Sequence, residues 1–307
     1  MTTSASFSII IPAYNYAHSV ERAAASVCQQ VYANREILII NDGSTDATAE
    51  VIDQFAAAHV DEVRVLHQVN AGLAAVRNRG VAESTNEWLI FLDADDELCP
   101  DALVVLAQAI VRHPQARLIV GGHETDDGKR RRYVAPWPCV ESKHENFSNY
   151  LDKRLTISNG GCAMHRSIFQ TTSYDAALRH TEDMPVFAHV LANYAIASVD
   201  KPVARIYKHA DSMRHDVDAA VKIGMSMELA IFDNNGLPEW AQDYRRGYRA
   251  RRALSLMKLA ASHGRPALVR HFFYVAFCAA PIQALHPRYL RRLLKNLFAH
   301  RGKRHQT

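Results

Sequence analysis

Short apolar runs alternate with amphipathic segments along the first 120 residues of the chain. Five runs have the length of a β-strand: Phe7–Ile11, Glu36–Ile40, Val63–His67, Trp88–Leu92 and Leu118–Gly121. Most are rich in Ile, Val or Leu, which is typical of strands buried on both faces of a sheet. Successive strands lie roughly 25–30 residues apart, which leaves room for a helix in each connection. The pattern predicts βαβ units and a mostly parallel sheet with flanking helices.

The segments between these runs carry helical periodicity. Apolar residues recur at intervals of three and four at Ala102, Val105, Leu106, Ala109 and Ile110, which predicts an amphipathic helix. Val51 and Phe55 lie four residues apart behind Asp46, a residue type that favours the start of a helix.

The second half of the chain has a different character. Residues 122–158 contain the charged turn Asp126–Arg132 and two prolines around Trp137, and we interpret them as an irregular segment. Glycines and short apolar pieces follow up to residue 215, and the pattern is helical from about residue 219. We therefore expect one α/β domain over residues 1–215, with halves 1–121 and 122–215, and a helical extension over residues 216–307.

Composition excludes several classes of protein. Hydrophobic residues make up 48% of the 307 residues and charged residues 22%, as in ordinary globular proteins. The five cysteines are scattered, odd in number and never in a CxxC pair. This argues against a disulfide framework or a zinc site and favours a reducing, cytoplasmic compartment.

Charge is distributed unevenly along the chain. The net charge is +4, yet Arg245–Arg304 contains fifteen Lys or Arg residues and no Asp or Glu. The first hundred residues are acidic on balance. Such asymmetry indicates a basic face for an anionic partner. Charge alone leaves nucleic acid, membrane lipid and an anionic acceptor open.

Candidate chemistry lies where the strands end, because ligands of parallel sheets bind beyond the carboxyl ends of the strands. The chain has neither a G-x-G-x-x-G nor a G-x-x-x-x-G-K-[ST] motif, which argues against dinucleotide-binding and P-loop proteins. Asp42 follows the second strand, where a carboxylate can accept hydrogen bonds from a base or a ribose. Asp93, Asp95, Asp96 and Glu97 crowd behind the fourth strand. A hard divalent cation would relieve their mutual repulsion; the alternative is a solvated acidic turn before a helix.

Four segments together resemble the inverting glycosyltransferases of family 2, which have the Rossmann-like GT-A fold. They are Ser8–Asn15, Asn41–Asp46, Asn70–Asn78 and Leu92–Asp96, and the resemblance extends over roughly residues 6–215. It implies that Gly72 and Arg77 lie near the base and phosphates, that Asp93 contacts the ribose, and that Asp95 ligates Mg²⁺ or Mn²⁺. The residues that it assigns to the nucleotide base are Pro12, Ala13, Tyr14, Asn15 and Asp42.

The resemblance also assigns roles in the second half. Glu182 and Asp183 match the family's acidic pair, with Asp183 as the base that deprotonates the acceptor hydroxyl; the alternative is that both are first-turn helix acids. The glycines of Asn159-Gly160-Gly161 would let the backbone approach an acceptor, unless the segment is a simple turn. Lys208 and His209 match the family's late motif near the diphosphate and the metal. Lys208 stands where relatives commonly have Arg, and so it lacks the bidentate fork.

The implied function is metal-dependent, inverting transfer of a sugar from a UDP- or dTDP-sugar to a saccharide or lipid-linked acceptor. A role in lipopolysaccharide or other surface-polysaccharide synthesis is the expected setting, with a rhamnosyl-, glucosyl- or galactosyltransferase of the lipopolysaccharide core as the first candidate and no nucleic acid as partner. The alternatives are a sugar nucleotidyltransferase, whose Gly-rich phosphate loop is missing here, and a non-catalytic binding module.

An apolar stretch, His271–Ile282, lies in the basic C-terminal region. It is too short for a membrane span and is interrupted by Pro281. Its aromatic residues Phe272, Phe273 and Phe277, with Arg288, Arg291, Arg292 and Lys295 behind them, fit an interfacial anchor on an anionic membrane. A packed helical subdomain with a solvated basic face fits equally well.

Overall fold

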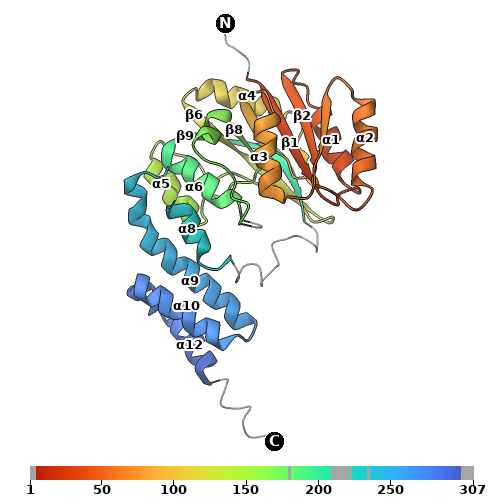
Figure 1. Cartoon of the computed structure of the whole chain (residues 1–307). Helices are drawn as coiled ribbons and strands as arrows, with labels where there is room; N and C mark the ends of the chain where they lie inside the picture. The colour runs from red at the N-terminus through yellow and green to blue at the C-terminus, as the bar shows by residue number, and fades with distance from the viewer. Residues whose placement is uncertain (1–4, 179–180, 209–220, 222, 234–235, 299–307) are drawn as a thin grey trace, which may run out of the picture. The chain divides into compact units, whose positions relative to one another are not determined.

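The structure is a computed structural model that describes residues 5–178, 181–208, 221, 223–233 and 236–298. The chain divides into two compact units, Met1–Ser212 and Met213–Thr307, which Figure 1 shows in colours from red to green and from teal to blue. Each unit is described by itself.

The first unit is built on one nine-stranded sheet of order β3-β2-β1-β4-β8-β6-β9-β5, with β7 paired to β6. Strands β1 to β4 are mutually parallel, as are β6 and β9, whereas β8 runs antiparallel to β4 and β6. Each of the five apolar runs forms a strand, which confirms the predicted α/β class. The strands are β1 (Phe7–Ala13), β2 (Arg35–Asn41), β3 (Val63–His67), β4 (Trp88–Phe91), β5 (Glu97–Leu98), β6 (Ala116–Asp126), β7 (Arg131–Val134), β8 (Cys162–His165) and β9 (Ala195–Tyr207).

Helices cover the sheet, and every residue of β1 is therefore buried. Ile9 and Ile11 join the large core cluster that contains residues of α1, α2 and α4, whereas Ile10 points toward α3. A Cβ on Gly80 of α3 would lie 2.5 Å from Ile10 Cγ2, so a glycine is needed for this close packing. The helices of this unit are α1 (Val20–Cys28), α2 (Thr48–Ala58), α3 (Leu73–Glu83), α4 (Ala102–Arg112), α5 (Lys143–Leu151), η1 (Arg166–Gln170) and α6 (Asp183–Asn193).

Asp46 was expected to cap α2, but the N-cap residue is Ala47, and it has no side-chain cap hydrogen bond. Asp46 Oδ1 accepts a hydrogen bond from Thr48 N at 2.9 Å, and the helix begins at Thr48. This bond satisfies a backbone donor that has no partner within the helix.

The irregular segment expected over residues 122–158 is wrong in part. Strand β6 continues to Asp126 and turns into β7, and α5 follows. The turn is held by Asp127 Oδ1, which accepts from Lys129 N at 2.9 Å and Arg130 N at 2.8 Å. The polar residues of this hairpin do not predict a strand. Pairing with β9 and β7 satisfies the backbone hydrogen bonds of β6 without an apolar pattern.

The second unit is helical, as the sequence pattern predicts. Helices α9 and α10 pack through Met257, Val269 and Phe272, which are at least 96% buried. Phe272 is therefore part of this core and not an exposed membrane contact, whereas Phe277 is 40% exposed. The elements are α8 (Ser226–Phe232), η3 (Glu239–Tyr244), α9 (Arg245–Ser262), α10 (Pro266–Ala279), α11 (Pro281–Ala284) and α12 (Pro287–Phe298). Across the described residues, no helix has both the length and the apolar character needed to cross a membrane.

Candidate active site

The turns that follow β1 and β2 are tied together. Asn15 N donates to Ser44 Oγ at 3.0 Å, and Asn15 Oδ1 accepts from Thr45 N at 2.8 Å. Asn15 adopts φ 60°, a conformation that asparagine tolerates better than most residues. Pro12 and Ala13 are buried in β1, whereas Tyr14 is 45% exposed. The geometry brings the predicted base-binding residues together at one edge of the sheet.

Asp42 lies inside this edge and is only 3% exposed. Its carboxylate accepts from Gln68 Nε2 at 2.7 Å, from Ala71 N at 2.9 Å and from Gly72 N at 2.8 Å. Gly72 has φ 87°, and a Cβ there would meet no atom within 4 Å. The glycine is thus required by the backbone conformation and not by crowding. Asp42 fixes the loop between β3 and α3 against the end of β2.

The acidic loop after β4 is more neutralised than its sequence suggests. Glu97 pairs with Arg22 at 3.1 Å and with Arg205 at 2.9 Å. Asp96 Oδ1 accepts from the backbone N–H of Tyr207 at 3.0 Å. Protein groups therefore relieve part of the expected repulsion, that of Glu97 and Asp96. Burial and then the charge of Asp95 still raise the pKa of Asp93, which Arg77 opposes.

Asp95, the residue of this loop that matches the metal position, is half-buried. Among the residues that the structure describes, no three His, Cys, Asp or Glu side chains gather closely enough to hold an ion, and His209 lies outside the described residues. A carboxylate oxygen is nonetheless the donor that Mg²⁺ and Mn²⁺ prefer, and Mg²⁺ is often held by one or two carboxylates together with substrate phosphates. The donor chemistry of Asp95 fits that mode.

Tyr16 and Arg22 also face this loop, although neither was a candidate residue from the sequence. Burial raises the pKa of Tyr16 most, and the charges of Asp95 and Asp93 raise it further. Arg22 donates to the backbone oxygen of Asp95 at 2.7 Å, and its guanidinium lies 4.1 Å from the centre of the Tyr207 ring. These contacts hold the Asp95 backbone in place.

Arg77 forms the buried centre of the site. Only 2% of it is exposed, and its guanidinium pairs with Glu182 at 2.7 Å and with Asp93 at 3.2 Å. The resemblance implies that Arg77 lies near the base and phosphates, which stays a prediction; in the structure its guanidinium lies between two carboxylates. A buried guanidinium requires such partners, because an unpaired charge is strongly unfavourable in the protein interior. Arg77 therefore links the acidic loop to the start of α6.

Asp183 is the first residue of α6 and is half-buried. Burial raises its pKa to about 6, Arg77 opposes that rise, and the charges of Glu182 and Asp93 add to it. Asn159 Nδ2 donates to Asp183 Oδ2 at 3.4 Å. A carboxylate with this pKa can accept a proton near neutral pH. Glu182 is 4% exposed and is paired with Arg77, so Asp183 is the better placed base.

Polar atoms beside Asp183 lack hydrogen-bond partners in the described part of the chain. They are Asn159 Oδ1 and Thr181 Oγ1, both buried. Such atoms usually have a partner in water or in a ligand. Gly160 is tightly packed, since a Cβ added to it would lie 3.2 Å from Leu92 Cδ1. The backbone at Gly160 therefore approaches Leu92, which follows β4. The backbone oxygen of Gly161 accepts a hydrogen bond from Gly121 N at 2.8 Å.

Lys208 follows β9 and is exposed. Its backbone N–H donates to Asp126 O at 2.7 Å, which ties the end of β9 to β6. The described contacts do not place its side chain against the acidic loop.

Solved structures define the class of this fold. A structure of S. aureus TarS, residues 1–349, matches with a TM-score of 0.68 and 16% identity, covering 98% of this chain and 93% of that chain. The mannosyltransferase PcManGT from Pyrobaculum calidifontis, in complex with GDP-Man and Mn²⁺, matches with a TM-score of 0.57 and 16% identity over 97% and 85% of the two chains. The architecture is the GT-A fold.

The sequence gives the family. Residues 8–172, more than half of the chain, match the model for glycosyl transferase family 2, and the chain belongs to this family. It is 41% identical over 100 residues to the uncharacterized glycosyltransferase YibD of Escherichia coli, covering 33% of this chain and 29% of that protein. It is 31% identical over 172 residues to the chondroitin synthase of Pasteurella multocida, covering 47% of this chain and 18% of that protein. The chain thus spans less than a third of the length of these two relatives.

Proposed function

We propose that the chain transfers a sugar from a nucleoside-diphosphate sugar to an acceptor hydroxyl, with inversion at the anomeric carbon. The observation that carries the proposal is Asp183, a half-buried carboxylate whose pKa is raised to about 6. Through Glu182 and Arg77 it is connected to Asp93 in the loop that follows β4. The proposed proton acceptor and the proposed donor-binding loop are thus joined through the buried guanidinium of Arg77.

The donor is proposed to bind along the ends of β1, β2 and β4. Tyr14 and Asn15 would contact the base, on a surface whose shape Asp42 maintains through its three hydrogen bonds. Asp93 would accept from the ribose hydroxyls. TarS structures in complex with UDP and with UDP-GlcNAc, and the PcManGT complex with GDP-Man, support a nucleotide sugar as the ligand class.

The transfer step uses Asp183 as general base. Asp183 takes the proton of the acceptor hydroxyl while the hydroxyl oxygen bonds to the anomeric carbon, and the bond from that carbon to the diphosphate oxygen breaks. Attack from the side opposite the leaving group inverts the anomeric configuration. Asn159 would orient the Asp183 carboxylate through the contact at 3.4 Å.

Asp95, with His209 and Lys208 from the late motif, would hold Mg²⁺ or Mn²⁺ and the diphosphate. Such an ion supplies charge neutralisation at the departing diphosphate. The Mn²⁺ in the PcManGT complex supports this assignment.

The acceptor and the setting are proposed from charge and from the relatives. A saccharide or lipid-linked acceptor of surface-polysaccharide synthesis, such as lipopolysaccharide, fits a family that includes a chondroitin synthase and a hyaluronan synthase. The donor would be a UDP- or dTDP-sugar. The exposed Tyr274, Phe277 and Ile282, with the cations of α12, would hold the protein on the cytoplasmic face of an anionic membrane.

The test is a thermal-shift screen of nucleotide sugars with Mn²⁺, followed by measurement of nucleoside diphosphate release. A donor that binds the native state should raise its melting temperature by mass action. The proposal requires at least one donor that both stabilises the protein and is turned over. If no UDP- or dTDP-sugar does either, the proposed donor class is wrong.

A further inference from the structure

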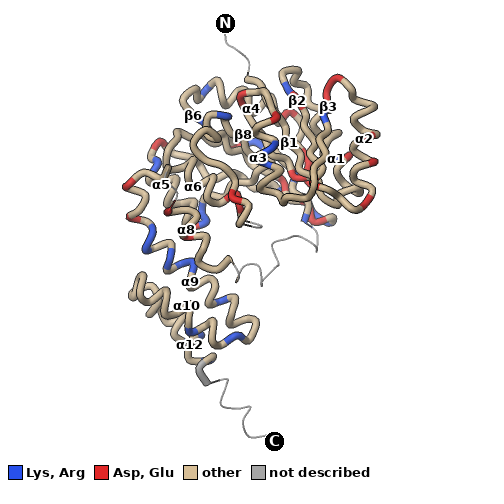
Figure 2. Tube along the Cα trace, viewed as in Figure 1, with Lys and Arg blue, Asp and Glu red and all other residues tan. Residues whose placement is uncertain are grey.

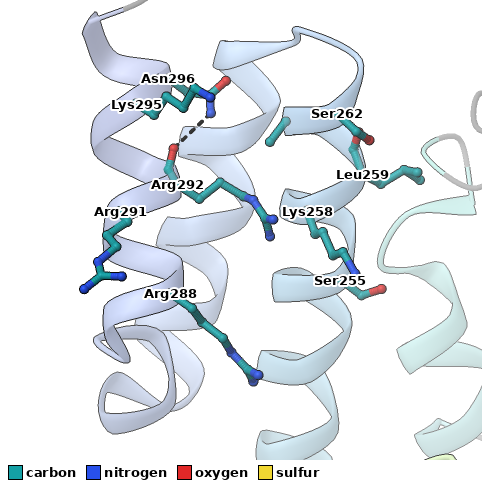
Figure 3. Close-up of a pocket in the computed structure, with 10 residues that line it drawn as sticks. Ser255, Lys258, Leu259, Ser262, Arg288, Arg291, Arg292, Lys295 and Asn296 are labelled. Carbon is teal, nitrogen blue, oxygen red and sulfur yellow. Dashed lines mark hydrogen bonds between the residues drawn. The ribbon is translucent and has the colours of Figure 1, made fainter.

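A cavity of about 760 Å³ lies between α9 and α12, within the second unit alone. Five cationic side chains line it, accompanied by small polar groups and by the apolar wall of Leu259 and Ala261. In Figure 3, Arg288 and Arg292 extend from α12 toward α9, on which Lys258 lies. The remaining cations are Arg291 and Lys295.

The charges of this cavity have no ion-pair partner among the described acidic residues. Helices α9 to α12 contain no Asp or Glu at all, and Figure 2 shows their Lys and Arg in blue without any red. Two acidic groups of the same unit pair with Arg245 instead, Glu228 at 2.5 Å and Asp233 at 2.6 Å. A concave surface lined by one sign of charge concentrates counter-ions.

The kinds of side chain favour a phosphate as the ligand. Arginine presents several N–H donors in a fixed fork that matches phosphate oxygens, and lysine adds a compact charge. Arg292 is half-buried, and its backbone oxygen accepts from Asn296 Nδ2 at 2.9 Å. Cations on two facing helices can contact different oxygens of one group. A phosphate with at least two charges offers enough oxygens for both sides.

We propose that the α9–α12 cavity is a binding site for a phosphate group that carries two or more negative charges. Inorganic pyrophosphate and the phosphomonoester headgroup of phosphatidic acid share this chemistry. The site differs from general attraction to an anionic surface, because Arg288 and Arg292 of α12 and Lys258 of α9 would bind one group together. It uses none of the residues of the donor site.

The experiment measures pyrophosphate binding to the full chain by calorimetry, with EDTA present so that no metal assists binding at the donor site. The variant Arg288→Gln/Arg292→Gln should weaken binding about tenfold or more, since hydrogen bonds to charged groups are among the strong ones. Lys258→Gln should weaken it from the opposite helix. The control variant is Arg246→Gln/Arg270→Gln, which removes the same charge from exposed positions outside the cavity. It should change affinity about twofold at most, because exposed charges at a distance are screened.

A second arm uses vesicles of phosphatidylcholine with either phosphatidic acid or phosphatidylserine, matched in surface charge. Stronger sedimentation with phosphatidic acid, lost in Arg288→Gln/Arg292→Gln, would identify a lipid source; pyrophosphate binding without this preference would identify a soluble one, and both support the site. The proposal is overturned if wild-type protein binds neither probe or if the cavity and control variants weaken binding equally. Melting curves of all variants should coincide, since the substituted side chains are exposed or half-exposed.

Discussion

Replacing Asp183 by Asn should make the protein more stable and nearly inactive. The pKa of Asp183 is raised from 3.8 to about 6, so the folded protein disfavours the ionised carboxylate. One pKa unit corresponds to about 1.36 kcal/mol, and the shift sets an upper limit of about 3 kcal/mol on the cost of ionisation at neutral pH. Because Asp183 is partly accessible to water, we expect a gain of about 1–3 kcal/mol for the Asn variant. That gain corresponds to roughly 2–10 °C in melting temperature for a domain of this size.

The pH dependence of this gain separates the carboxylate from other effects of the substitution. The folded pKa lies above the unfolded one, so between about pH 4 and pH 6 the folded state binds more protons and wild-type stability falls as pH rises. The amide side chain of the variant does not titrate in this range. The difference between variant and wild type should therefore vanish below about pH 4, grow up to about pH 6 and stay constant above it.

The assay is thermal unfolding at several pH values, together with release of nucleoside diphosphate from a donor sugar. Asp183→Asn should lower turnover about 10²–10⁴-fold, as loss of a general base does, while donor affinity stays near wild type. Asp61→Asn, at an exposed position, is the control for the loss of one charge. The reasoning is refuted if Asp183→Asn is less stable than wild type at pH 7.5, or if its stability difference does not change with pH. Near wild-type turnover of Asp183→Asn would indicate that Glu182 is the general base instead.

Three further changes test other parts of the site and fold. Asp95→Ala should abolish metal-dependent donor binding and leave the fold intact; calorimetry that shows unchanged Mn²⁺-dependent affinity would contradict this. Arg77→Leu should destabilise the protein by about 3–5 kcal/mol, because it leaves two carboxylates without their buried partner; denaturant unfolding with an unchanged midpoint would show that the pairing contributes little. Gly80→Ala should cost about 1–3 kcal/mol, because the new Cβ would lie 2.5 Å from Ile10 Cγ2; an unchanged melting temperature would show that α3 moves aside at little cost.

The strands could be predicted because they are continuous apolar runs. Strand β3 has the predicted bounds, and β1 and β2 extend only one or two residues beyond them. The β6–β7 hairpin could not be found by that signal. Its stability comes from pairing with β9, which is distant in sequence, and from the side chains of Asp126 and Asp127 in the turn.

The site shows the same division between local and distant signals. Asp42 was selected because it follows a strand, and the same rule applied to β3 would have selected Gln68, which donates to Asp42 at 2.7 Å. The pairing of Arg77 with Glu182 joins residues 105 positions apart. No local pattern predicts such a pair, because it depends on how α3 and α6 pack, and so the pairing of Arg77 with carboxylates was not expected.

The stereochemistry of the product tests the central claim most directly. With a donor found in the screen, NMR spectroscopy can identify the anomer of the sugar first released or transferred, before mutarotation mixes the forms. Direct displacement assisted by Asp183 predicts a product whose anomeric configuration is opposite to that of the donor, and loss of this product in Asp183→Asn. A product that retains the donor configuration would contradict the account, because retention requires a covalent intermediate or another mechanism in which Asp183 is not the base that activates the attacking hydroxyl.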